Sequence, residues 1–409
     1  MKILHVASFK GNYEDIINHT GLYKMLNTHL KKSPFIKQLE IRLFYRNENL
    51  YRFDDEFVDE VNKFDLLILG GGGFFDVRFN DSSTGTTIDI SKSVIDRIQI
   101  PVLINAMGYH EFEGEYEEAK VRFKKFILYV QQKKNWFVTF RNDGSILRIN
   151  RTIEEDSPSS SLSPSPACTY TMMPKRKYVQ YSRTVSPLIE VPDNGFFFTD
   201  LDVIEKPAAK IIGVNITNDE FTRKFNGNIT IERFNKEISK VISSVVSKGF
   251  RIIFFLHTPQ DIQTLSLLQN FLGPKYFRYN IEIAPYNPTN IEATKELEYY
   301  YRKCRLIVAM RFHSTILAIQ NGIPVIGLAG HEQISSLYEE LDLEDQFIRV
   351  GEDNYIAKLE DKIINVLDHF EKYSLAEKKV VNSIKREGKL YYKRIAIFLS
   401  KYYPDEILT

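Results

Sequence analysis

Residues 101–140, PVLINAMGYHEFEGEYEEAKVRFKKFILYVQQKKNWFVTF, contain the pattern from which the fold class can be predicted. Segments 101–106 and 136–140 are short apolar runs, which are typical of buried strands. Between them, segment 115–132 has apolar residues at helical spacing and predicts an amphipathic helix. A strand, a helix and another strand in this order form a parallel pair with a right-handed crossover. The pattern therefore predicts an α/β fold with a parallel sheet.

The same alternation occurs earlier in the chain and then a second time further on. Segments 2–7 and 64–69 predict two earlier strands of the first series. A second series begins after residue 210, where segment 231–248 predicts a helix. The strands of this second series are predicted at 211–216, 251–256, 281–284, 306–309 and 324–328.

Two such series predict two Rossmann-like domains facing a cleft, the architecture called GT-B. We expect an N-terminal Rossmann-like domain at residues 1–203 and a C-terminal Rossmann-like domain at 204–375. Within the first domain, segment 156–166 is rich in Ser and Pro and predicts a loop. Segment 376–409 predicts a helical region that crosses back onto the first domain.

Composition and charge exclude several classes of protein. The chain has 409 residues, with 54 Lys+Arg against 53 Asp+Glu, so its net charge of +1 excludes a nucleic-acid binder that works by bulk positive charge. Two cysteines exclude a disulfide framework, and no His, Asp or Glu cluster has metal-ligand spacing. No apolar run approaches the ~20 residues that span a bilayer. We expect a cytoplasmic protein without a metal, and peripheral membrane association and the oligomeric state stay open.

A run of glycines follows the predicted strand at 64–69. Gly71, Gly72, Gly73 and Phe74 would then lie at the carboxyl edge of a parallel sheet, where ligands bind. Glycine lets the backbone approach an anion or a sugar closely. The alternative is a tight turn without a ligand.

Arg141, Asp143 and Ser145 follow the predicted strand at 136–140, again at a carboxyl edge. The guanidinium of Arg141 would bind a carboxylate or a phosphate bidentately. The alternative is structural: Arg141 pairs with Asp143, and a helix begins at Ser145.

Arg311, Phe312, His313 and Ser314 follow the predicted strand at 306–309 and open a helix predicted at 315–321. A helix N-terminus with an Arg and a His combines positive charge, a proton donor and unpaired N–H groups, which suits an anionic ligand. A core histidine would instead be embedded in an apolar element, so this pattern favours a functional site.

His257 ends the predicted strand at 251–256, and Thr258 and Pro259 follow as an N-cap and a first helical residue. Capping explains this pattern fully. A phosphate contact from His257 is the alternative.

The ordered set of these motifs resembles the polysaccharide pyruvyl transferases, over nearly the whole chain. The residues that carry the resemblance are Asn12 and Asp15, the glycines at 70–73, Arg141 to Ser145, segment 192–196, and Arg311 to Ser314 followed by Ala318, Gly322 and Pro324.

The resemblance implies a GT-B-like transferase of cell-surface polysaccharide or glycan synthesis. Members of that family move the pyruvyl unit of phosphoenolpyruvate onto two hydroxyls of a sugar as a cyclic ketal and release phosphate. Phosphoenolpyruvate would then be a co-substrate, with no further cofactor, and the partner would be a glycan acceptor. Arg311 and Arg141 would bind the two anionic groups of the donor, and His313 would be the general acid.

The resemblance also assigns the remaining positions. The donor side would include Phe312, Ser314, Gln333 and His257, and the acceptor side or cleft would include Asn12, Asp15, Gly71, Gly72, Gly73, Phe74, Asp143 and Ser145. Two positions depart from the family, which often has Asp at Asn142 and Lys at Gln333. Either another cation, such as Arg223 or Lys224, would replace the missing Lys, or the donor would differ.

Two other functions stay open. A nucleotide-sugar glycosyltransferase could use the same architecture, but it would need an acidic ribose-binding residue that the second domain does not clearly show. A non-catalytic binding or partner protein is favoured by the departures at Asn142 and Gln333.

Overall fold

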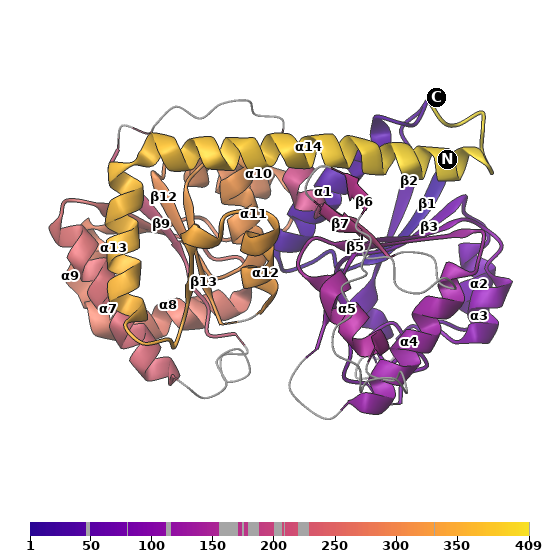
Figure 1. Ribbon diagram of the computed structural model, residues 1–409, viewed down its shortest axis with the longest axis horizontal. Coiled ribbons are helices and arrows are strands. Elements are labelled where there is room, and N and C mark those ends of the chain that lie inside the picture. Colours follow the sequence, from indigo (N-terminus) through magenta and orange to yellow (C-terminus); the bar gives the residue numbers. More distant parts are fainter. Residues whose placement is uncertain are drawn as a thin grey trace. The chain divides into compact units, whose positions relative to one another are not determined.

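The protein forms two compact α/β units, each built on one six-stranded parallel sheet (Figure 1). The computed structural model describes residues 1–45, 50–79, 81–111, 116–154, 171–173, 176–178, 188–199, 207, 209–219, 229–330 and 332–408. The predicted fold class of two Rossmann-like units is confirmed. The predicted loop at 156–166 lies outside the described residues, as do Arg223 and Lys224.

The first unit comprises Met1–Phe9, Tyr23–Asp193 and Glu387–Thr409. Its strand order, 2-1-3-4-5-8, reverses between β1 and β3, as in doubly wound sheets. The strands are β2 (Phe35–Glu40), β1 (Lys2–Ala7), β3 (Leu66–Asp76), β4 (Val102–His110), β5 (Trp136–Arg141) and β8 (Ile189–Val191), given in spatial order. The helices are α2 (Asp55–Val61), α3 (Lys92–Arg97), α4 (Glu117–Gln131) and α5 (Ser145–Glu154), with a separate hairpin of β6 (Thr171–Met173) and β7 (Arg176–Tyr178).

The second unit comprises Lys10–Leu22 and Asn194–Arg386. Its sheet has the Rossmann order, with the reversal between β9 and β12. The strands are β11 (Ile281–Ile283), β10 (Arg251–Phe254), β9 (Ile211–Asn215), β12 (Leu306–Ala309), β13 (Val325–Ala329) and β14 (Phe347–Arg349). The helices are α7 (Ile231–Ser247), α8 (Pro259–Leu272), α9 (Pro274–Tyr279), α10 (Ile291–Arg302), α11 (Phe312–Gln320), α12 (Glu332–Glu340) and α13 (Tyr355–Asp368).

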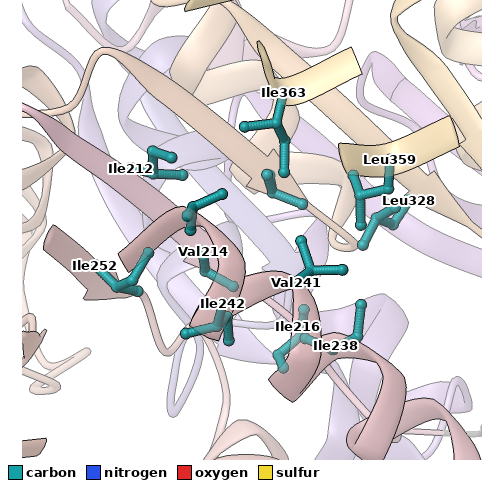
Figure 2. Close-up of a pocket in the computed structure, with 12 residues that line it drawn as sticks. Ile212, Val214, Ile216, Ile238, Val241, Ile242, Ile252, Leu328, Leu359 and Ile363 are labelled. Atoms are coloured by element: carbon teal, nitrogen blue, oxygen red, sulfur yellow. The ribbon is translucent and has the colours of Figure 1, made fainter. Parts of the chain in front are cut away.

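The core of the second unit contains a small cavity of about 20 Å³ (Figure 2). Val214 of β9, Val241 of α7 and Leu359 of α13 are among its twelve lining residues, all of which are aliphatic. A cavity without polar groups has nothing to orient a sugar or an anion. It is therefore a packing void of the core.

Helices α1 (Tyr13–Asn27) and α14 (Phe370–Ser400) each contribute residues to both units. In α14, which Figure 1 shows as one long helix, the hydroxyl of Tyr391 donates a hydrogen bond to Oδ1 of Asn105 at 2.6 Å. The prediction that the C-terminal helix crosses back to the first domain is confirmed. The predicted boundaries at 203 and 375 stay predictions, and the compact units themselves are discontinuous in sequence.

Two predicted element boundaries at the candidate site residues are wrong. The glycine run does not follow a strand but lies inside β3, because β4 continues alongside it and pairs Gly72 with Met107. The helix predicted at 315–321 begins at Phe312, with Arg311 as its N-cap residue, so His313 lies within the first helical turn.

Candidate functional site

The carboxyl ends of β9 and β12 meet where the strand order of the second sheet reverses. The backbone carbonyl of Asn215, the last residue of β9, accepts a hydrogen bond from Met310 N at 2.9 Å. Its side-chain Oδ1 accepts another from Arg311 N at 3.1 Å. Asn215 thus fixes the start of α11 at the position where ligands bind in open α/β sheets.

The guanidinium of Arg311 is fixed by three side chains from two segments of the chain. Nε lies 3.0 Å from both carboxylate oxygens of Asp261, and Nη2 lies 2.7 Å from Oδ1 of the same residue. Nη2 also donates to Oγ1 of Thr258 at 2.6 Å and to Oγ1 of Thr217 at 3.1 Å. Burial acts against the charge, but Asp261 and further carboxylates outweigh it and raise the pKa of Arg311. Arg311 is therefore a permanently charged group in a fixed orientation.

Asp261 also completes the N-terminus of α8. Its Oδ2 accepts a hydrogen bond from His257 N at 2.9 Å, and it forms a capping box with Thr258. Thr258 is the N-cap residue and Pro259 is the first helical residue, as predicted. One carboxylate therefore both caps α8 and orients Arg311.

His313 faces Glu14, a residue of α1. Oε2 of Glu14 lies 3.6 Å from Nδ1 of His313, and Oε1 lies 3.8 Å from Nδ1 of His257. Burial acts to raise the pKa of Glu14, but His313, Arg311 and His257 together lower it well below its ordinary value. The carboxylate is therefore ionised and stands between two imidazole rings.

His257 is fully buried and belongs to a chain of polar groups. Its Nε2 lies 2.8 Å from the hydroxyl of Tyr301, which lies 2.7 Å from Oγ of Ser314. Burial lowers the pKa of His257 to about 4, although Glu14 and Asp261 act in the opposite direction. His257 is therefore neutral at pH 7, and its contacts are those of a buried structural residue.

The segment that carries Glu14 is fixed within the second unit by its own hydrogen bonds. Tyr13 N donates to the carbonyl of His257 at 3.3 Å, and its hydroxyl donates to the carbonyl of Pro285 at 3.2 Å. Oδ1 of Asn12 accepts from Glu14 N at 2.8 Å, so Asn12 caps α1. Asp15 lies in the same first turn and is half-buried.

A second polar cluster lies at the carboxyl edge of the first sheet. Nε of Arg141 donates to Oδ2 of Asp143 at 2.6 Å, and Nη1 lies 3.7 Å from Oδ2 of Asp193. Ser145 is the first residue of α5, and its hydroxyl donates to Oδ1 of Asp143. Burial acts to raise the pKa of Asp143, but Arg141 and other positive groups lower it to about 2. The structural alternative for Arg141 is thus observed, and a contact with a ligand stays a prediction.

Two glycines make room for this cluster. A Cβ atom on Gly73 would lie 2.5 Å from Nε2 of His110, and one on Gly108 would lie 2.7 Å from Nη2 of Arg141. The same two atoms, His110 Nε2 and Arg141 Nη2, lie 3.3 Å apart. The glycine of β3 therefore serves to admit a neighbouring side chain.

The predicted site residues fall into two groups. In the second unit are Asn12, Asp15, His257, Arg311, Phe312, His313, Ser314 and Gln333, and in the first are Gly71, Gly72, Gly73, Phe74, Arg141, Asp143 and Ser145. Phe312 and Ser314 are buried beside His313, and Gln333 is half-buried in the first turn of α12. The expectation that both groups face one cleft stays a prediction.

Sequence reasoning missed Glu14 and the contact of Asp261 with Arg311. Glu14 stands between the two positions, Asn12 and Asp15, that the motif did single out. A carboxylate in the first turn of a helix has an ordinary explanation in the helix dipole, so the sequence carried no distinct signal for it. Among the described residues, no group of three or more His, Cys, Asp or Glu is arranged to bind a metal ion.

Comparison with known proteins identifies the class and then the family. HepE of Anabaena, solved with UDP and glucose, is 10% identical over 98% of this chain and 100% of that chain, with a TM-score of 0.52. MnaA of S. aureus, solved with UDP, is 13% identical over 96% of this chain and 97% of that chain, with a TM-score of 0.48. The similarity to HepE and the two parallel sheets define a GT-B-like protein. No curated protein matches the chain in sequence.

The family model of the polysaccharide pyruvyl transferases matches residues 7–332. The chain therefore belongs to the polysaccharide pyruvyl transferase family. That match includes both Glu14 and the segment from Arg311 to Ser314. Among the helices of the described part of the chain, none is long and apolar enough to cross a membrane.

Proposed function

We propose that the protein transfers the pyruvyl group of phosphoenolpyruvate to two hydroxyls of a sugar in a polysaccharide or glycan, forming a ketal. The observation that carries this proposal is the site at the carboxyl edge of the second sheet. There, a fixed positive charge on Arg311 and a carboxylate–histidine pair of Glu14 and His313 occur together. The first group suits an anionic donor, and the second suits proton transfer.

Arg311 would bind an anionic group of the donor through one nitrogen. Nε and Nη2 are used by Asp261, Thr258 and Thr217, whereas Nη1 has no hydrogen bond to any residue that the structure describes. An oxygen of the carboxylate or phosphate would complete the set of contacts at Nη1. A bidentate contact through the Nε edge is not open to the donor, because Asp261 occupies that edge of the guanidinium.

His313 would supply the proton that starts the reaction. The electron pair of the donor's C=C bond takes a proton from His313, so the methylene becomes a methyl group and the adjacent carbon becomes cationic. A sugar hydroxyl bonds to that carbon and loses its proton. The C–O bond to phosphate then breaks, and its electron pair leaves with the phosphate. The second hydroxyl bonds in its place and closes the ketal; one released proton returns to His313 and the other leaves with phosphate.

The proposal includes no cofactor besides the donor. Arg141 stays a predicted second cation, although Asp143 and Asp193 already offset its charge. A cytoplasmic location is part of the proposal, because the buried Cys304 is a free thiol and fits a reducing compartment.

The test is to measure the free energy of unfolding of the purified protein in the presence of phosphoenolpyruvate, in the presence of UDP-glucose, and without a ligand. A ligand at 100 times its Kd stabilises a protein by roughly 2.7 kcal/mol, so each outcome is measurable. We expect stabilisation by phosphoenolpyruvate, and release of inorganic phosphate when sugar diols are added. Stabilisation by UDP-glucose alone would favour the glycosyltransferase, and stabilisation by neither would favour the binding protein.

A further inference from the structure

Glu14 has an environment that its place in the sequence does not explain. Its side chain is 17% exposed, and each oxygen faces one imidazole: Oε2 faces His313 at 3.6 Å and Oε1 faces His257 at 3.8 Å. Oε1 is buried and has no hydrogen-bond partner within the described residues. A buried carboxylate is costly unless nearby positive charge compensates it. Arg311 supplies part of that positive charge, and a protonated imidazole beside Glu14 would supply more.

Of the two histidines, His313 is the one suited to carry that proton. His257 is fully buried, and its Nε2 contacts the hydroxyl of Tyr301, which in turn contacts Ser314. His313 lies in the first turn of α11, where the helix N-terminus disfavours a positive charge, and Arg311 is the N-cap residue of the same helix. Glu14 is the negatively charged group that offsets these two effects at His313.

We propose that Glu14 is a positioning residue that keeps a proton on Nδ1 of His313 and orients the ring for action on the substrate through Nε2. A carboxylate that accepts from one ring nitrogen of a histidine fixes the tautomer and favours the protonated ring. The contact of 3.6 Å is slightly longer than a hydrogen bond, and such contacts commonly shorten when substrate binds. The catalytic consequence rests on the proposed function, whereas the effect on His313 does not.

The effect on His313 can be measured without any substrate. In the full-length protein, the titration of His313 is followed by NMR of histidine-labelled samples and assigned with the His313→Gln variant. An opposite charge within about 4–6 Å shifts a pKa by roughly 1–3 units, so Glu14→Gln should lower the pKa of His313 by at least about one unit. Glu14→Asp should restore part of the shift, and Glu292→Gln, at an exposed position of α10, should leave it unchanged.

The catalytic consequence is measured separately, as the pH profile of turnover with phosphoenolpyruvate. In Glu14→Gln the alkaline limb of kcat should move to lower pH while KM for the donor changes little, because Glu14 acts through His313. An unchanged His313 titration in a folded Glu14→Gln protein overturns the inference, whatever the turnover. If the wild-type protein turns over no pyruvyl donor, the proposed function fails, and the titration still decides the role of Glu14.

Discussion

The carboxylate of Asp261 lies 2.7–3.0 Å from two nitrogens of Arg311 while it accepts the backbone N–H of His257 at 2.9 Å. Asp261 is fully buried, and the side chain of Arg311 is 10% exposed. The two charges therefore depend on each other, because neither has enough water around it to be stable alone. The start of α8 and the orientation of Arg311 are consequently coupled through one side chain.

Breaking this pair should strongly destabilise the protein. Asp261→Asn removes the negative charge and leaves Arg311 charged and buried, for which the cost is about 3–5 kcal/mol. Urea unfolding of Asp261→Asn measures this loss of stability. The double variant Asp261→Asn, Arg311→Met should recover part of the loss, since the uncompensated charge is gone. A loss below about 1 kcal/mol in the single variant would mean that the pair is not compensating a buried charge.

Replacement of His313 should separate donor binding from chemistry. His313→Gln keeps a hydrogen-bond donor of similar size but cannot deliver a proton, so turnover should fall by on the order of 10²–10⁴. Calorimetry should show nearly unchanged affinity for phosphoenolpyruvate. His369→Gln, at an exposed position after α13, is the matched control and should keep full turnover. Wild-type turnover in His313→Gln would limit His313 to binding.

A buried carboxyl on α14 should make stability depend on pH. Glu377 is fully buried, and burial raises its pKa well above the ordinary value, so it is neutral in the folded protein. As the pH rises above about 4.5, the unfolded state gains by ionising Glu377 while the folded state does not, so stability falls. Glu377→Gln removes this loss of stability, because glutamine does not ionise. The melting temperature of this variant should exceed that of the wild type at pH 7, and the difference should shrink toward pH 4.

The control for Glu377 is Glu339→Gln, which changes an exposed carboxylate of α12. Its melting temperature should follow the wild-type curve at every pH. If Glu377→Gln is instead less stable than the wild type at pH 7, then the carboxyl of Glu377 makes a favourable contact in its ionised form.

The cavity of the second unit should accept one more methylene group. Val241→Ile would extend a side chain of α7 into the void of about 20 Å³, and filling of such cavities commonly stabilises by about 0.5–2 kcal/mol. Chemical denaturation measures the gain. Val246→Ile, on the same helix but not among the residues that line the cavity, should be close to neutral. A loss above about 1 kcal/mol in Val241→Ile would show that the void is too narrow and the core is overpacked.

Buried central strands could be predicted from the sequence, whereas among the described edge strands only β11, predicted at 281–284, was found. The bounds of β1 and β12 were predicted to the residue, because both are short, mainly apolar runs. β2 reads FIKQLE and lies at a sheet edge with little burial, so it lacks the apolar pattern of a strand. β14 is an edge strand of three residues, which is too short to show any periodicity.

The site was predictable where it follows from topology. Arg311 and His313 stand directly after a strand, and the rule that ligands bind at carboxyl edges suffices to single them out. Glu14 is 299 positions from His313 in the chain. Its contact depends on the packing of the first turn of α1 against the rest of the second unit, which no local pattern encodes. The pairing of Arg141 was foreseen only as an alternative, because a sequence does not show which of two anions an arginine binds.

The assignment of Lys10–Leu22 to the second unit has a consequence for the evolution and engineering of this protein. Consider a chimaera in which everything after a single junction near residue 194 is taken from a relative. Its Arg311 and His313 would come from the relative, whereas its Glu14 would come from this protein. His313 and Glu14 would then come from different parent proteins. Recombination within this fold therefore has to carry two stretches of gene together, or the two stretches must change in step. A synthetic peptide of residues 10–22 added to an isolated fragment of residues 194–386 would be the corresponding complementation in the laboratory.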